Sequence, residues 1–216
     1  MKYFTLLTSH LFALGILFSL LLPASLASQS APKVEGDLVG SGVLEYQNVL
    51  SGHYRLTDNS DEDNFAYTLT LLGTDLQPLG SKVYDVNEAM EFEAIAFNGR
   101  YLGLLIKEGA IRYLDILDGN GERVRRQKLK RGYGSRGFFL HPVADGFIAS
   151  VGVVGNAYSP VSRISFTLNK VTAEDEEKDW EREFKGEKKN QSVVPRYLAG
   201  DEENLVLVVT RLRQFT

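Results

Sequence analysis

The most distinctive group of charged residues in this chain is a basic segment, "RVRRQKLKRGYGSR", residues 123–136. Seven of its 14 residues are Lys or Arg, although the chain as a whole is acidic, with 24 basic and 28 acidic side chains. Tyr133 lies between two glycines, where its ring can stack beside a guanidinium. The pattern indicates either a binding site for an anionic partner or a solvated strand and loop whose cations balance acids elsewhere.

The anionic partners that fit this segment are an acidic glycan, a phosphate-bearing lipid headgroup and an acidic protein surface. Nucleic acid is not expected, because the net charge of the chain is negative. We expect the ligand-binding residues to come from this segment and from the histidine that follows it: Arg123, Arg125, Arg126, Lys128, Lys130, Arg131, Tyr133, Arg136 and His141.

Two acidic segments raise the question of a metal site. In "YLDILDGNGERV", residues 113–124, a calcium loop counted from Asp118 would need glycine at its sixth position and glutamate at its twelfth. Arg123 and Leu129 occupy those places, so the segment favours a hairpin turn in which Gly119 and Gly121 take positive φ angles. The segment "DNSDED", residues 58–63, also lacks the calcium spacing and is interpreted as a solvated loop. The sequence therefore predicts no metal and no cofactor.

Catalytic motifs are equally scarce. There is no cysteine and no G-x-S-x-G elbow, and beyond the first 27 residues the histidines are His53 and His141, either of which fits a structural role. Two carboxylates that cleave a glycosidic bond need only meet in space, so a sequence cannot exclude them. We expect binding rather than catalysis, with a secreted propeller hydrolase acting on glycans as the alternative.

The N-terminus predicts export. Residues 1–27 carry one charged side chain, Lys2, then the apolar run "LFALGILFSLLLP" and small residues, a pattern typical of a cleaved signal peptide. An uncleaved membrane anchor is the alternative, although the apolar run is short of the roughly 20 residues that span a bilayer. Cleavage after Ala27 leaves 23 basic and 28 acidic side chains, a net charge of −5, and no transmembrane segment. Because cysteine is absent, neither lipidation nor a disulfide is expected. The protein is thus placed in the periplasm, at the outer membrane or outside the cell.

Strand patterns dominate the remainder of the chain. Residues 28–42 are polar and small and predict a flexible leader, and residues 43–216 predict one β-repeat domain. Strand-like segments that begin at residues 66, 110 and 161 each open a series of four, and the fourth members begin at 101, 147 and 205. Asn98-Gly99 and Asp145-Gly146 hold equivalent hairpin positions in the first two series. Units of four short strands every 40 to 50 residues or so are typical of β-propeller blades, and a β-sandwich is the alternative.

The number of units is unusual. Together with the N-terminal strands "GVLEYQNVL" and "GHYRLT", the three units make about three and a half blades, whereas a propeller has roughly four to eight. We expect either a piece of a longer propeller or a partner that covers the last apolar strand.

The phrases "GHYRLTDNSDEDNFAYTLTLLGTDLQPLGSKVY", "AIAFNGRYLGLLI" and "IRYLDILDGNGERV" resemble an uncharacterised family of exported, β-rich, propeller-like bacterial proteins. The similar elements are Asp75-Leu76, Phe97-Asn98-Gly99 and the segment 115–121, with Phe97 where the family usually has tyrosine. The resemblance covers roughly residues 50–212 and rests on strand-and-turn phrases. It implies a periplasmic or secreted propeller-like protein and supplies no catalytic residue.

Overall fold

The structure, a computed structural model, describes residues 36–129, 136–154, 164–187, 191–200 and 205–213. These residues form an all-β fold of fourteen strands with one 3-10 turn, η1 (Glu176–Lys178), which confirms the predicted fold class at this level. No helix in these ranges is long and apolar enough to cross a bilayer. Of the predicted site residues, Lys130, Arg131 and Tyr133 lie outside the described residues, as does the predicted signal segment.

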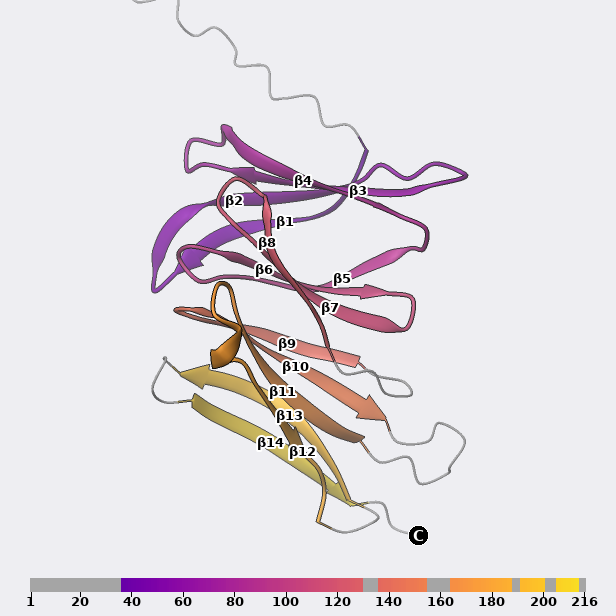
Figure 1. The fold of residues 1–216 in the computed structure, drawn as a ribbon, viewed down its shortest axis with the longest axis vertical. Coiled ribbons are helices and arrows are strands. Elements are labelled where there is room, and N and C mark those ends of the chain that lie inside the picture. Colours follow the sequence, from indigo (N-terminus) through magenta and orange to yellow (C-terminus); the bar gives the residue numbers. More distant parts are fainter. Residues whose placement is uncertain (1–35, 130–135, 155–163, 188–190, 201–204, 214–216) are drawn as a thin grey trace, which may run out of the picture. The chain divides into compact units, whose positions relative to one another are not determined.

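The strands form three four-stranded antiparallel sheets and one two-stranded sheet (Figure 1). The first sheet contains β1 (Asp37–Tyr46), β2 (Val49–Asp58), β3 (Phe65–Leu72) and β4 (Pro78–Val86). The second contains β5 (Met90–Phe97), β6 (Leu102–Glu108), β7 (Ile111–Leu117) and β8 (Arg123–Lys128). The third contains β9 (Arg136–Val143), β10 (Gly146–Val154), β11 (Ile164–Thr172) and β12 (Trp180–Phe184). The two-stranded sheet pairs β13 (Gln191–Gly200) with β14 (Leu205–Arg213). Every strand lies next to its neighbour in the chain, so each sheet is a continuous run of hairpins.

The grouping of strands into units differs from the prediction. The predicted strands 66–72 and 101–107 correspond to β3 and β6, so the predicted first unit takes two strands from the first sheet and two from the second. The positions of the strands themselves agree with the prediction because their apolar patterns are clear. The short connection between β4 and β5 resembles a hairpin turn in the sequence, although it crosses from one sheet to the next. The described residues form four sheets, where a β-sandwich would have two.

The start of the first strand also differs from the prediction. β1 begins at Asp37, inside the segment 28–42 whose composition predicts a flexible leader. Its residues pair in antiparallel register with β2, from Asp37 opposite Asp58 to Tyr46 opposite Val49. Small and polar residues in this strand hide it from a composition-based prediction, because the pairing is made by the backbone and not by the side chains. The leader prediction is therefore wrong for residues 37–42.

Alternating side chains pack each sheet against the next in chain order. On β6, Leu102, Leu104 and Ile106 lie in the core shared with the first sheet, whereas Leu105 lies in the core shared with the third. Because successive side chains of a strand point to opposite faces, the second sheet is apolar on both sides. On β10, Phe147 contributes to the core with the second sheet, and Ile148 to the core with β13 and β14.

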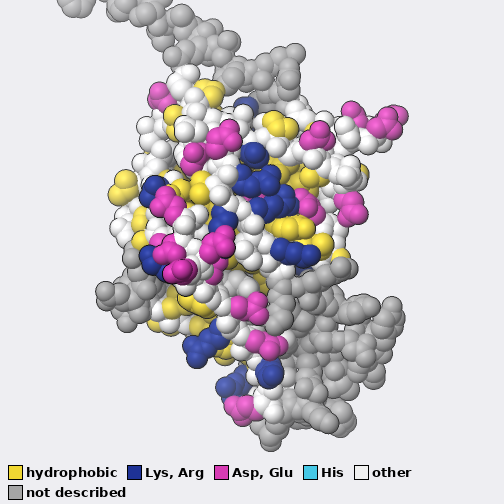
Figure 2. Space-filling view, in the orientation of Figure 1, with side chains coloured by type: hydrophobic (Ala, Val, Ile, Leu, Met, Phe, Trp, Pro, Cys, Tyr) yellow, Lys and Arg dark blue, Asp and Glu magenta, His cyan; other side chains and the backbone are white. Residues whose placement is uncertain are grey.

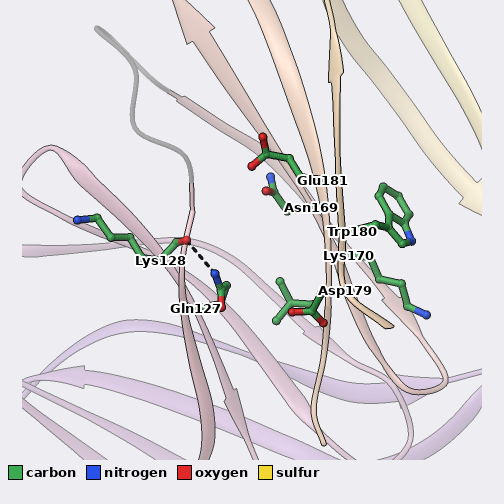
Figure 3. A pocket seen from close by; sticks show the side chains of 8 residues that line it. Gln127, Lys128, Asn169, Lys170, Asp179, Trp180 and Glu181 are labelled. Atoms are coloured by element: carbon green, nitrogen blue, oxygen red, sulfur yellow. Dashed lines mark hydrogen bonds between the residues drawn. The ribbon is translucent and has the colours of Figure 1, made fainter. Parts of the chain in front are cut away.

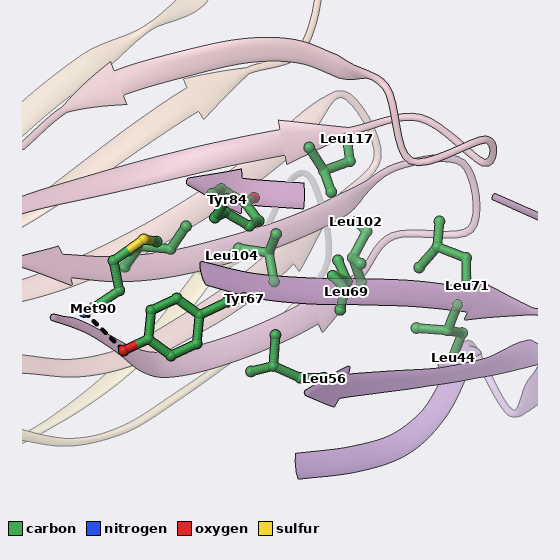
Figure 4. Close-up of a cluster of buried hydrophobic side chains, with 11 residues drawn as sticks. Leu44, Leu56, Tyr67, Leu69, Leu71, Tyr84, Met90, Leu102, Leu104 and Leu117 are labelled. Carbon is green, nitrogen blue, oxygen red and sulfur yellow. Dashed lines mark hydrogen bonds between the residues drawn. The ribbon is translucent and has the colours of Figure 1, made fainter. Parts of the chain in front are cut away.

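The first of these cores is formed by the inner face of the first sheet and one face of the second (Figure 4). Leu56, Leu69 and Tyr84 project from the first sheet toward Leu104 and Leu117 of the second, and all five are buried. A large buried aliphatic side chain contributes about 1.5–3 kcal/mol through the hydrophobic effect, so this contact holds the two sheets together. The backbone of β8 is thereby fixed, since β8 is bonded to β7 at the edge of the second sheet.

Candidate functional site

The basic segment begins on β8, where the side chain of Arg125 is engaged by the third sheet. Its Nη2 donates to Oδ2 of Asp179 at 2.6 Å, and its Nη1 donates to the Thr172 carbonyl at 2.8 Å. The Asp179 carboxylate also accepts hydrogen bonds from the Thr172 N–H at 2.8 Å and hydroxyl at 3.0 Å. Burial raises the pKa of Asp179, but these bonds to Arg125 and Thr172 outweigh burial and hold it below its usual value. Arg125 is therefore a fixed link between two sheets.

Arg126 is engaged within the second sheet. Its guanidinium lies over the ring of Tyr113, 4.1 Å from the centroid, and it is hydrogen-bonded to Glu108. Burial lowers the pKa of Arg126, but the bond to Glu108 and the charge of Asp115 raise it further than burial lowers it. The guanidinium thus remains charged, and its charge is neutralised inside the protein.

Arg123 and Arg126 share a buried carboxylate. The side chain of Asp115 on β7 is fully buried, and Nε of each arginine lies 3.4 Å from one of its oxygens. These contacts are ion pairs without hydrogen-bond geometry. The neighbouring Tyr84 hydroxyl also interacts with the Asp115 carboxylate. Burial raises the pKa of Asp115 above its usual value, against the lowering effect of the two arginines. Burial and the charge of Asp115 likewise raise the pKa of Tyr84.

These contacts change the interpretation of the basic segment. Arg123, Arg125 and Arg126 are all paired with acids of the same chain, as the solvated-strand alternative expects. Lys128 differs, because its side chain is exposed and, within the part of the chain that the structure describes, it forms no ion pair. The backbone of Arg136 lies on β9, opposite Gly152. Figure 2 shows that basic and acidic side chains are interspersed on the visible face of the molecule.

A hollow of about 250 Å³ lies beside Lys128, between β8 and the β11–β12 hairpin (Figure 3). It is lined by Gln127, Lys128, Asn169, Lys170, Val171, Asp179, Trp180 and Glu181. Asn169 and Glu181 are cross-strand neighbours, so their side chains share the face of the hairpin that looks toward Gln127. Lys170 and Trp180 form the next pair and project on the opposite side.

The amide groups give this hollow its hydrogen-bonding character. Asn169 is only 7 % exposed, and its Nδ2 has no hydrogen-bond partner among the described residues. Gln127 accepts a bond of 3.3 Å from Arg125 and donates one of 3.2 Å to the Lys128 carbonyl. A buried amide donor without a partner costs about 1–3 kcal/mol. A hydroxyl or carboxylate that reached Asn169 would recover this cost.

His141 lies in a different hollow from Lys128. Its neighbours there are Glu45, Tyr46, Gln47, Pro142, Val143 and Gly200, around a space of about 380 Å³. The His141 ring lies within hydrogen-bond distance of the Gly200 carbonyl, with Nε2 at 3.3 Å. Burial lowers the pKa of His141, partly offset by that contact. The predicted site residues that the structure describes are therefore divided between two places and do not form one cluster.

The two acidic segments form turns. Oδ1 of Asp118 accepts hydrogen bonds from the Asn120 and Glu122 N–H groups, both at 2.9 Å, so this carboxylate closes the predicted β7–β8 hairpin. Gly121 has a φ of +83°, as expected, whereas Gly119 does not take a positive φ. In the other segment, Asp61 accepts from the Asn64 N–H at 2.8 Å. Both segments are thus organised by carboxylate-to-backbone bonds within the turn.

Sequence reasoning did not identify Asp115, Asn169 or Asp179 as parts of this region. One signal was present for Asp115, a single acid inside the apolar strand "YLDIL", where a charge must be paired to be buried. Asn169 and Asp179 carry no such signal, because they meet β8 only through the packing of the third sheet. Comparison of the chain with models of known protein families, with curated proteins and with solved structures finds no match.

Proposed function

We propose that this chain is an exported, propeller-like binding protein that recognises an acidic glycan at the hollow beside Lys128. It acts by binding, without catalysis, in the periplasm, at the outer membrane or outside the cell. One observation carries the proposal. Among the described residues, this hollow combines Lys128, an exposed cation without an ion pair, with the buried amide of Asn169, whose Nδ2 has no hydrogen-bond partner.

The chemistry of the hollow supports a glycan over the other anionic partners. Amide and carboxylate groups such as Gln127, Asn169 and Glu181 exchange hydrogen bonds with sugar hydroxyls, which lipid phosphates and acidic protein patches largely lack. Lys128 supplies a charge for a uronate or sulfate group on the same ligand. The cations of residues 130–136 follow directly in the chain and are further candidates for contact with an acidic ligand.

The propeller-like arrangement is supported by the order of the strands. Each four-stranded sheet is a meander of consecutive strands, as a propeller blade is. The first strands of successive sheets also contact each other, β1 with β5, β5 with β9 and β9 with β13. In a propeller these strands would surround the central channel. Export is supported by the signal-like pattern of residues 1–27 and by the resemblance to exported β-rich proteins.

The ion pairs of β8 decide which variants can test this proposal. Charge reversal at Arg125 or Arg126 would break ion pairs that hold the fold, so a loss of binding there would be uninformative. Lys128→Glu removes the exposed charge instead, and the double variant Lys130→Glu/Arg131→Glu tests the following segment. Lys185→Glu, at an exposed position outside the hollow, is the matched control.

The experiment measures retention on immobilised polygalacturonate, on a neutral dextran and on anionic lipid vesicles, at low and high salt. Retention on polygalacturonate alone is expected, with Lys128→Glu weakening it about tenfold at low salt, and high salt reducing the difference. Asn169→Leu is expected to weaken it as well, because the amide donor is lost. If Lys128→Glu and Lys185→Glu are retained equally, or if the protein prefers vesicles, the glycan proposal is wrong.

A further inference from the structure

The hollow beside His141 lies where the first strands of the sheets end. Its lining comes from the end of β1 and the turn after it, from the end of β9 and from the end of β13. The β5–β6 turn joins this group, because the Asn98 amide donates to the Val143 carbonyl and a Cβ atom at Gly99 would lie 3.0 Å from the Tyr46 ring. The carboxyl ends of β1, β5, β9 and β13 therefore meet at one place. In a closed propeller these ends would surround one mouth of the central channel.

The β1–β2 turn gives the hollow a fixed wall. Two residues between the paired Tyr46 and Val49 form this turn. They are Gln47 and Asn48, and their φ angles are +52° and +64°. Two consecutive positive φ angles suit a tight hairpin, but glycine is the usual residue for at least one of them, and strained backbone of this kind is concentrated at functional sites. The turn thus keeps the Gln47 side chain in the lining of the hollow, although glycine would fit the backbone better.

The charge of this hollow is opposite to that of the hollow beside Lys128. Among the described residues of its lining, Glu45 alone is fully charged at neutral pH, because none is Lys or Arg and burial lowers the pKa of His141. The Glu45 side chain is exposed and, within the ranges that the structure describes, forms no ion pair or hydrogen bond. An anion would be repelled by this carboxylate, whereas a cation would be attracted.

His141 supplies a hydrogen-bond acceptor. Its Nε2 lies 3.3 Å from the Gly200 carbonyl, which can only accept, so Nε2 carries the proton of the neutral ring. Nδ1 is then left as an acceptor. The ring of Tyr46 adds an aromatic surface, and the faces of such rings attract cations. A carboxylate, an imidazole acceptor and an aromatic ring in one hollow suit an ammonium group, which has N–H donors and no acceptor.

We propose that this hollow binds the ammonium group of a small organic amine, such as an amino sugar or a polyamine. The ammonium pairs with the Glu45 carboxylate, donates to Nδ1 of His141 and lies against the Tyr46 ring. The hollow has a volume of about 380 Å³, within the range of roughly 300–1,000 Å³ that small-molecule sites have, so it also accommodates the carbon skeleton that carries the amine. The inference does not depend on the proposed glycan, which has the opposite charge and binds at a different hollow.

The test follows the ring signals of His53 and His141, the two histidines of the chain that begins at Ser28, by proton NMR at pH 7. Glucosamine and spermidine are added separately, with glucose and N-acetylglucosamine as matched compounds that lack the ammonium group. The His141 signals should shift in a saturable way with at least one of the amines, and those of His53, which does not line the hollow, should shift much less. The variant His53→Gln assigns the signals. A lower dissociation constant for glucosamine indicates an amino sugar, and one for spermidine indicates a polyamine.

Two charge variants show whether the amine binds at the hollow. Glu45→Gln should raise the dissociation constant about tenfold, because the ion pair is lost. Glu62→Gln, at an exposed position in the β2–β3 loop outside the hollow, is the matched control and should leave it unchanged. Equal weakening by the two variants would show that the net negative charge of the chain attracts amines in general, and would overturn the proposal.

Two further results would overturn the proposal. One is that neither amine shifts the His141 signals, and the other is that glucose binds as tightly as glucosamine. Far-UV circular dichroism confirms that Glu45→Gln is folded. Retention on polygalacturonate, measured on the same proteins, reports the proposed function separately, so that each proposal can fail without the other.

Discussion

The side-chain amide of Asn98 donates a hydrogen bond of 3.0 Å to the backbone carbonyl of Val143 and so joins the β5–β6 turn to the β9–β10 turn. Its Oδ1 meanwhile accepts from the Tyr101 N–H at 2.7 Å and the Arg100 N–H at 3.1 Å within its own turn. Asn98 is only 4 % exposed, so these bonds form in a nearly water-free place. One side chain thus fixes a hairpin and holds two sheets in register.

Replacement of Asn98 by Ala should lower the free energy of unfolding by about 2–4 kcal/mol, because the buried Tyr101 N–H, the partly buried Arg100 N–H and the Val143 carbonyl lose this partner. Asn98→Asp should be at least as damaging near neutral pH, since a carboxylate cannot donate to Val143. Urea unfolding monitored by circular dichroism measures both. Asn87→Ala, at an exposed position before β5, is the control and should change stability by less than about 0.5 kcal/mol. Equal effects at the two positions would contradict the role of Asn98.

The Arg125–Asp179 pair should contribute stability that disappears in acid. Arg125→Met leaves the partly buried Asp179 without its cation and should cost roughly 2–4 kcal/mol at pH 7. The pKa of Asp179 is below its usual value in the folded chain, so its contribution is complete above the unfolded pKa of about 3.9 and is lost as the pH falls through the folded value. The difference in stability between the two proteins should therefore shrink from pH 7 to pH 3. The double variant Arg125→Met/Asp179→Asn completes a cycle, and additive effects would show that the pair is not coupled.

Asp115 should have the opposite dependence on pH. Its pKa is raised by burial in the folded chain, so the folded state binds a proton more readily than the unfolded state. Stability from this group is lost as the pH rises from the unfolded pKa through the folded one, by at most about 1.4 kcal/mol per pH unit. The unmodified chain should thus gain stability relative to Asp115→Asn between pH 7 and pH 4.5. A difference that stays constant over this range would contradict a raised pKa.

The β7–β8 turn packs against β4, and this contact leaves no room for a side chain at Gly80. A Cβ atom there would lie 1.9 Å from the carbonyl oxygen of Asn120, so backbone must move to admit it. Gly80→Ala should cost about 1–3 kcal/mol or more by overpacking. Gly40→Ala, on β1 of the same sheet, adds a Cβ with no atom within 4 Å and is the matched control. Thermal unfolding compares the two, and equal melting temperatures would show that the turn does not press on β4.

Much of the fold could be predicted from the sequence, because strands are encoded locally. Alternating apolar residues or short apolar runs identified the segments that form β3, β6, β10 and β14, and turn residues identified hairpins such as the one between β5 and β6. The grouping into sheets could not be predicted in the same way. The grouping depends on whether the two strands that flank a connection pair with each other or belong to different sheets, as β4 and β5 do. Both kinds of connection are short and polar.

The candidate site was less predictable for a different reason. The cations of β8 were visible in the sequence, but the acids that neutralise them lie 18 residues away at Glu108 and 54 residues away at Asp179. Only the packing of the sheets shows that Arg125 and Arg126 form ion pairs with acids, whereas Lys128 forms none among the described residues. The same packing separates His141 from Lys128, although only twelve residues intervene between them in the chain.

Because every strand pairs with its neighbour in sequence, backbone pairing requires only the closure of short loops. Hairpins of this kind form in roughly microseconds, and local contacts of this type favour fast folding. The chain can therefore build each sheet in the order in which it emerges during synthesis. The apolar faces are covered more slowly, since each is buried only when the next sheet in the chain has formed and packs against it. The inner face of the first sheet therefore stays uncovered until the second sheet has formed, and a chaperone could bind it during that time.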